Sequence, residues 1–298
     1  MDDAPPLLLE DLRDGLVVLW IGAGVSISAG LPGWYDFLRR IAAAADTDWT
    51  WDGASDEVQF QLIEAVGRDR FVSLMLPVLT SESPPSQNFR RLCELMGMAN
   101  FAAIISTNWD MLIDDSGCCD QVAYLGRDDV VIDDRLFKEP HLHPRSTSCR
   151  QKPLLIKMLG DVSNPSMLNV SKDDYSRTFA MKSSFLDRLT RRYSILSIGR
   201  SGGQLGETFA ANPAHNTGIP RMRQFFLRND LSSEDKLKLA EQDITAISYS
   251  STETQWQGNR LFLEKLVAFL QGERQSGLTT FPMVKREQGF GCVESLFE

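Results

Sequence analysis

The sequence predicts an α/β fold built on a doubly wound, mostly parallel sheet. Five short apolar runs alternate with segments of helical period along the 298 residues. Unbroken apolar runs are typical of strands that helices cover on both faces. Strands that alternate with helices favour parallel order. A glycine-rich turn follows the first run, as expected where a strand passes into a helix in such a sheet.

The expected strands and helices follow from this pattern. Strands are predicted at 15–21, 101–106, 153–159, 193–199 and 244–250. Amphipathic helices are predicted at 34–45, 56–67, 70–79, 88–98, 183–192 and 255–271. The block at 34–98 is too long for one crossover, so we expect a helical insertion within a Rossmann-like domain at 1–271. Residues 116–152 show no clear helical or strand period, so we expect a long, partly irregular excursion there. We expect residues 272–298 to form a polar C-terminal tail.

Composition limits the classes of function. No run of 18 apolar residues occurs, and the N-terminus is acidic before its apolar patch, so we expect neither a membrane span nor a secretory signal. A net charge of −9 argues against direct nucleic-acid binding. Five cysteines without CxxC spacing fit a reducing cytoplasm. His141 and His143 have no third ligand in view, so we expect no metal site.

The glycine-rich turn, "LWIGAGVSISAGLPGW", is the first candidate site. Gly22 and Gly24 permit turn dihedrals and close approach of a ligand to the backbone. Ala23, Val25 and Ser26 would open a helix whose N–H groups attract phosphate. Ile27 stands where the dinucleotide fingerprint has its third glycine. By itself, therefore, the turn fits nucleotide binding and a plain strand-to-helix connection equally well.

The longer stretch resembles the opening motif of the sirtuin-like (silent-information-regulator type) NAD-binding family. That motif is a G-A-G-x-S turn followed by G-[IL]-P and an aromatic residue. The matching positions are Gly22, Ala23, Gly24, Ser26, Gly30, Leu31, Pro32 and Trp34.

Two later segments extend the resemblance. The stretch Ser106-Thr107-Asn108-Trp109-Asp110 resembles the family's T-x-N-x-D element. Cleavage of the nicotinamide–ribose bond passes through an oxocarbenium-like state, for which a side-chain amide is needed beside the ribose hydroxyls or the attacking water. The competing interpretation is that Thr107 and Asn108 cap a helix starting near Trp109. In "ILSIGRSGGQ", Gly199 and Ser201 resemble the family's late G-x-S turn.

One position departs from the family. In the family's bacterial NAD-hydrolysing branch, the strand that corresponds to 153–159 often ends in L-H-G. Here Leu159 stands before Gly160, in place of the catalytic histidine. A positioned general base typically contributes ~10²–10⁴ in rate. Asp161, His141 or His143 could stand in for it. The zinc-binding cysteine quartet of protein deacylases is also absent from the sequence.

The resemblance implies a sirtuin-like effector of bacterial antiphage defence that hydrolyses NAD to ADP-ribose and nicotinamide, alone or when assembled as a homo-oligomer or with a partner. The alternative is a catalytically inactive pseudoenzyme that serves a ring-forming ATPase or an Argonaute-type protein as an assembly module. A signal-nucleotide receptor is a third reading, and a deacylase is the last. The expected catalytic residues are Asn108 and Asp110. The expected NAD-binding residues are Gly22, Ala23, Gly24, Ser26, Pro32, Trp34, Thr107, Gly199 and Ser201.

Overall fold

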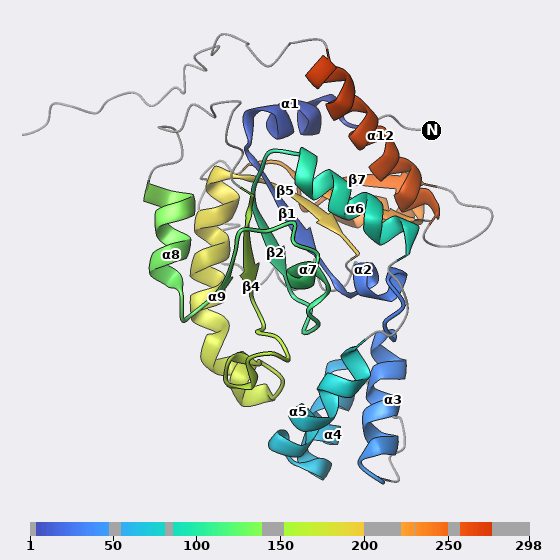
Figure 1. The fold of residues 1–298 in the computed structure, drawn as a ribbon, viewed down its shortest axis with the longest axis vertical. Helices are drawn as coiled ribbons and strands as arrows, with labels where there is room; N and C mark the ends of the chain where they lie inside the picture. The colour runs from blue at the N-terminus through green and yellow to red at the C-terminus, as the bar shows by residue number, and fades with distance from the viewer. Residues whose placement is uncertain are drawn as a thin grey trace, which may run out of the picture.

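A parallel sheet forms the centre of the molecule (Figure 1). The computed structural model describes residues 4–47, 55–80, 86–138, 152–199, 222–229, 231–249 and 257–275. Within them the sheet has seven strands in the order β3-β4-β2-β1-β5-β6-β7, and every neighbouring pair is parallel. The strands are β1 (Val17–Ile21), β2 (Phe101–Ser106), β3 (Gln121–Tyr124), β4 (Leu154–Lys157), β5 (Ser194–Ile198), β6 (Gln224–Asn229) and β7 (Ile244–Tyr249). The predicted fold class is confirmed.

Helices cover both faces of the sheet. Val17, Leu19 and Ile21 point into an apolar cluster with α1 (Pro6–Asp14), α2 (Ala23–Ser28), α6 (Gln87–Met98) and α12 (Gln257–Gln275). Val18 and Trp20 point the other way, toward α8 (Asp129–Asp133), the π-helical turn η1 (Asp134–Lys138), α9 (Lys172–Arg192) and α11 (Ser233–Ala240). Successive side chains of a strand alternate between faces, so both sides of β1 are buried and its sequence is apolar throughout.

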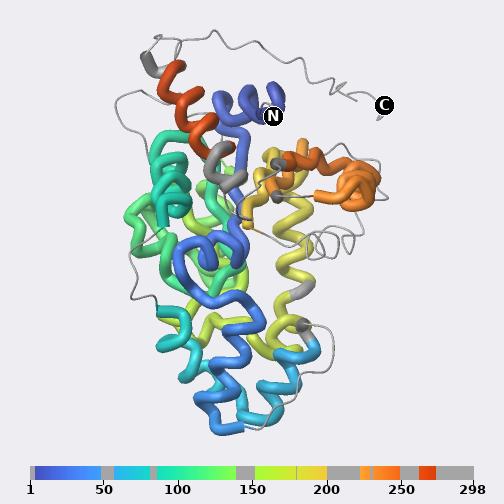
Figure 2. Tube along the Cα trace, turned by 90° about the vertical axis from the view of Figure 1, so that its right-hand side faces the viewer, coloured from blue at the N-terminus to red at the C-terminus, as the bar shows by residue number. Residues whose placement is uncertain are grey.

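Three helices form a separate layer at the carboxyl end of the sheet. The ribbon in Figure 1 and the Cα trace in Figure 2 both place α3 (Trp34–Ala44), α4 (Ser55–Val66) and α5 (Arg68–Leu79) beyond α2. They pack on one another around their own apolar cluster, hereafter the α3–α5 module. The fourth helix of the predicted block, α6, packs instead against α2 and α12 on the sheet.

The predicted irregular excursion at 116–152 contains regular structure in its described part. β3, α8 and η1 lie within it, and α7 (Leu112–Asp115) precedes it. Helix α9 begins at Lys172, well before the predicted start at 183, because Ser171 and Asp174 form a capping box. None of the helices in the described segments is both long and apolar enough to span a membrane.

Candidate functional site

Three predicted motifs meet at the carboxyl ends of the central strands. β1 lies between β2 and β5, and Ile21 pairs with Ser106 on one side and with Ile198 on the other. The residues that follow these three, Gly22, Thr107 and Gly199, are therefore neighbours. The chain winds outward in both directions from β1, which makes this edge the topological switch point where open α/β sheets bind ligands.

The glycine turn is fastened to the end of β5. The N–H of Gly22 donates to the carbonyl of Ile198 over 3.0 Å, and that of Gly24 to the carbonyl of Gly199 over 2.8 Å. Gly199 has φ +72°, and a Cβ there would lie 2.7 Å from the Val25 nitrogen. Only glycine fits such a close approach. The N–H groups of Gly22 and Gly24 thus already bond the protein backbone.

Ser26, Asn108 and Asp110 form one buried hydrogen-bonded chain, the polar trio. The Asn108 side-chain amide Nδ2 donates to Ser26 Oγ over 2.8 Å and to the Gly22 carbonyl over 3.1 Å. Ser26 Oγ in turn donates to Asp110 Oδ2 over 2.6 Å. Bonds linked in this order polarise one another and strengthen the chain.

The trio fixes which way the Asn108 amide faces. The Gly22 carbonyl can only accept a hydrogen bond, so the Asn108 atom that contacts it must be the NH₂ group. Both hydrogens of that group are used by Ser26 and Gly22. Asn108 Oδ1 takes part in neither bond and is left as an acceptor. The geometry therefore supplies an oriented carbonyl oxygen at the switch point.

The helix-capping interpretation of Thr107 and Asn108 is wrong. The next helix, α7, starts at Leu112, and its N-cap, Met111, makes no side-chain cap. Thr107 Oγ1 donates instead to the Ile21 carbonyl over 3.4 Å. Asp110 satisfies the first turn of α7, because its Oδ1 accepts the Leu112 N–H over 3.1 Å.

A buried lysine supports the segment that carries Asp110. Lys157, the last residue of β4, is 2% exposed, and its Nζ donates to the Asp110 backbone carbonyl over 2.7 Å. The same Nζ lies 2.7 Å from Asp114 Oδ2 and 3.5 Å from Asp161 Oδ2. The Asp114 contact is an ion pair without hydrogen-bond alignment. Burial raises the pKa of Asp114 above its ordinary value, and the Lys157 charge opposes that rise.

Sequence reasoning missed this lysine network. The available signal was a lysine inside the otherwise apolar run "PLLIKML", since a fully buried lysine needs an acidic partner. Its partner Asp114 stands four residues after Asp110. Tyr124, at the end of the unpredicted strand β3, completes the network by donating to Asp161 Oδ2 over 2.9 Å.

Asp161 is not placed to replace the missing base. It is fully buried. One of its oxygens accepts from Tyr124, and the other from the Ser163 N–H and hydroxyl at 3.0 and 2.6 Å. A carboxylate so occupied offers no free lone pair toward a ligand. His141 and His143, the other proposed substitutes, lie outside the described residues.

Leu159 belongs to an apolar wall between the sheet and the α3–α5 module. Its half-buried side chain packs against the module's cluster, which also contains Trp109, Val162 and Leu168. Gly160 follows with φ +72°, and a Cβ there would lie 2.3 Å from the Met167 carbonyl oxygen. The glycine of the family's His-Gly pair is thus required by the turn, while the histidine position is apolar.

The remaining predicted NAD-binding residues lie on the segment that leads into the module. Pro32 is half-buried, and Trp34 opens α3, with its ring 5.4 Å from that of Trp109. Trp109 is buried, and its indole N–H has no hydrogen-bond partner among the described residues. Ser201 lies outside the described residues.

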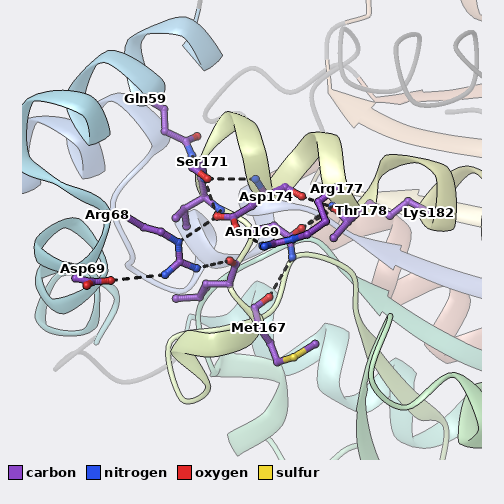
Figure 3. Close-up of polar contacts among 12 residues, drawn as sticks. Gln59, Arg68, Asp69, Met167, Asn169, Ser171, Asp174, Arg177, Thr178 and Lys182 are labelled. Atoms are coloured by element: carbon purple, nitrogen blue, oxygen red, sulfur yellow. Dashed lines mark hydrogen bonds and ion pairs between the residues drawn. The ribbon is translucent and has the colours of Figure 1, made fainter.

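Polar contacts tie the module to the segment after Gly160 (Figure 3). Arg68 of α5 contacts the capping residue Asp174 at 3.3 Å and donates to the Leu168 carbonyl over 3.0 Å. Gln59 of α4 bonds the Val170 carbonyl. Burial acts to raise the pKa of Asp174, yet N–H groups of Ser171 and Val170 and the Arg68 charge leave it below its ordinary value.

In the described parts of the chain, no three His, Cys, Asp or Glu side chains are grouped so that they could hold a metal ion.

The fold and the trio define a class of protein: a doubly wound α/β chain whose glycine turn and Asn108–Asp110 segment, which resemble the motifs of the sirtuin-like family, lie together at its switch point. Among characterised proteins, the chain is similar to the NAD(+) hydrolase ThsA of Acinetobacter baumannii (strain 532279), with 25% identity over 171 residues. This match confirms the predicted resemblance to the sirtuin-like NAD-hydrolysing branch.

The match covers part of each protein. It spans 56% of this chain and 32% of the relative, so the chain matches about a third of the relative's length. No protein-family model matches the chain. A solved sirtuin structure, from a study of sirtuin substrate affinity, aligns with 92% of this chain and 98% of its own at 15% identity and a TM-score of 0.35.

Proposed function

We propose that this chain binds NAD at the switch point and hydrolyses it to ADP-ribose and nicotinamide, as a sirtuin-like effector of bacterial antiphage defence. The observation that carries the proposal is the polar trio. Ser26, Asn108 and Asp110 come from two distant segments and are buried together where parallel sheets bind ligands. The similarity to an NAD(+) hydrolase supports the same substrate.

In the proposed reaction, Asn108 acts through the oxygen that the trio leaves as an acceptor. This oxygen accepts a hydrogen bond from a ribose hydroxyl or from the attacking water, and so orients that group toward the anomeric carbon. Because Nδ2 is held by Gly22 and Ser26, the amide is oriented before the substrate arrives. Such preorganisation lowers the barrier, since no rearrangement is needed in the transition state.

Asp110 has two roles in the proposal. Its carboxylate anchors Ser26, which in turn holds Asn108. In the proposal it would also hold the nicotinamide carboxamide. Lys157 fixes the Asp110 backbone from behind. Hydrolysis suits a site without the histidine better than deacylation does, because the leaving group departs dissociatively and water traps the cation.

In the proposal, the NAD phosphates lie along the glycine turn, at Gly22, Ala23, Gly24 and Ser26. The N–H groups of Gly22 and Gly24 already bond the backbone at the end of β5. Their contribution in the proposal is therefore close approach without a Cβ, rather than donated hydrogen bonds.

The packing of Leu159 favours a second candidate, an inactive subunit that uses this fold for assembly. Its side chain is part of the apolar wall, so the position of the family's base now contributes to the core. Such a chain would serve a ring-forming ATPase or an Argonaute-type partner, with NAD or another nucleotide as a bound ligand.

The two candidates are separated by measuring NAD consumption and nicotinamide release by the purified chain, with and without its neighbouring operon product. Asn108→Ala tests the trio, Leu159→His restores the base, and Gln271→Ala on α12 is an amide control outside the trio. If the site is active, Asn108→Ala lowers turnover by about 10²–10³-fold, and Gln271→Ala does not. Equal turnover in wild type and Asn108→Ala contradicts the proposed catalytic role. Turnover that appears only in Leu159→His identifies an inactive subunit with an otherwise complete pocket.

A further inference from the structure

Three cysteines pack against the apolar cluster on the α6 side of the sheet. Cys93 lies on α6, and Cys118 and Cys119 lie in the turn between α7 and β3. All three are free, half-buried and packed against the apolar cluster of the α6 face. The Cys118 thiol donates to the Cys93 backbone carbonyl over 3.5 Å, although the two residues are 25 positions apart. The fold thus brings two distant thiols into contact.

The two sulfurs in contact differ in acidity. The hydrogen bond from Cys93 lowers the pKa of Cys118 to about 6, against the effect of burial, and Ser116 and Lys152 add to the lowering. The same hydrogen bond and burial raise the pKa of Cys93. Burial chiefly raises that of Cys119 to about 12. Of the two, Cys118 is therefore the more acidic thiol and Cys93 the less acidic one, which is the arrangement of a reactive cysteine and its resolving partner.

We propose that Cys93 and Cys118 form an oxidation site that closes to an intrachain disulfide with a hydroperoxide as the oxidant. The Cys118 thiolate attacks one peroxide oxygen, the O–O bond breaks, and the departing hydroxide takes a proton to become water. Cys118 is then a sulfenic acid. The Cys93 sulfur gives up its proton, attacks the sulfenic sulfur and expels hydroxide, which that proton converts to water. Two thiols lose two electrons, and hydrogen peroxide becomes two waters.

The position of the pair gives the oxidation a structural consequence. Cys118 follows α7, whose Asp114 pairs with Lys157, the residue that bonds the Asp110 backbone. A disulfide would fasten the far end of α7 to α6 and so restrain the segment that carries Asp110. The proposed disulfide rests on the contact between Cys118 and Cys93 and on the acidity of Cys118, and it does not depend on NAD hydrolysis.

Peptide mapping of the full-length chain tests the proposal. The reduced protein is exposed to hydrogen peroxide, blocked with an alkylating agent and digested, and linked peptides are identified by mass spectrometry. We expect a Cys93–Cys118 link that dithiothreitol reverses. Cys93→Ser should abolish the link and leave Cys118 as a sulfenic acid that dimedone captures, while Cys119→Ser, the matched control, should keep it. A link from Cys118 to Cys119, Cys149 or Cys292 in place of Cys93 overturns the proposal.

A second measurement on the unmodified sequence does not depend on any variant folding. The rate of Cys118 alkylation is followed against pH in the native protein. The groups that face its sulfur are Cys93, Cys119, Ser116 and Lys152. We expect a half-maximal rate near pH 6. A midpoint at the ordinary cysteine pKa of about 8.5 contradicts the proposed thiolate.

Discussion

Replacement of Lys157 by methionine tests whether the buried charges hold the site together. Methionine keeps the length and apolar stem of the lysine, so the change removes a charge without opening a large cavity. It leaves Asp114 and Asp161 without their cation, and the Asp110 carbonyl without its donor. The Lys157, Asp114 and Asp161 side chains are 1%, 6% and 0% exposed, so solvent cannot take over the role of the lost charge.

Breaking one side of a buried ion pair costs about 3–5 kcal/mol. A domain of this kind has a total stability of about 5–15 kcal/mol. Lys157→Met should therefore lower the free energy of unfolding by a large fraction, and the melting temperature by on the order of 10 °C. Urea unfolding at neutral pH measures the loss as a fall in the transition midpoint.

The loss should depend on pH. Burial raises the pKa of Asp114 on folding, and without Lys157 it should rise further. A carboxyl group whose pKa is raised on folding contributes stability below its unfolded pKa of about 3.9 and loses that contribution as pH rises through the folded pKa. The deficit of Lys157→Met relative to wild type should therefore shrink as pH falls from about 7 toward 5, because Asp114 takes up a proton.

The double variant Lys157→Met/Asp114→Asn is the control. It removes the unpaired charge and should recover part of the lost stability. The reasoning is refuted if Lys157→Met is as stable as wild type at neutral pH, or if adding Asp114→Asn recovers nothing.

Three further changes have expected outcomes. Gly160→Ala should lower the free energy of unfolding, measured in urea, by several kcal/mol, because its Cβ would lie 2.3 Å from a backbone oxygen. Gly117→Ala, with φ +67° and open space around the Cβ, should lower it by only about 1–2 kcal/mol. Equal losses in the two variants would contradict the steric argument. Arg68→Ala should cost about 1 kcal/mol, since the arginine is one-third exposed, and should speed amide hydrogen exchange in α4 and α5; unchanged exchange there would mean that this contact does not hold the module. The oxidised Cys93–Cys118 form should be more stable than the reduced one by about 3 kcal/mol for a loop of this length, and a lower melting temperature on oxidation would show that the disulfide strains the fold.

Much of the fold could be predicted from sequence because most strands are covered on both faces. All five predicted strands exist, and each is an apolar run. β3 and β6 escaped prediction for local reasons. β3 has only four residues and begins with an exposed glutamine. In β6 only three apolar residues, Phe225, Phe226 and Leu227, stand between polar ones. Helix α9 was predicted too short because its first turns are polar, although Ser171 and Asp174 give the sequence signal of a capping box.

The candidate site was predicted in outline but not in its connections. The spacing of Asn108 and Asp110 indicated one pocket, and the strand order brings both beside Ser26. Which atoms bond could not be read from spacing, since it depends on how β1 and β2 align. The lysine network lay further out of reach, because Tyr124 comes from a strand that the pattern did not reveal.

The apolar wall has a consequence for how the pocket can change shape. Trp109 sits between the two site residues Asn108 and Asp110 in the chain, yet its ring packs in the core of the α3–α5 module with Leu159. Trp109 therefore links the segment that carries Asn108 and Asp110 to the module. We expect a displacement of those three helices to reach the trio through this tryptophan, beside the contacts that Arg68 and Gln59 make to the segment after Gly160.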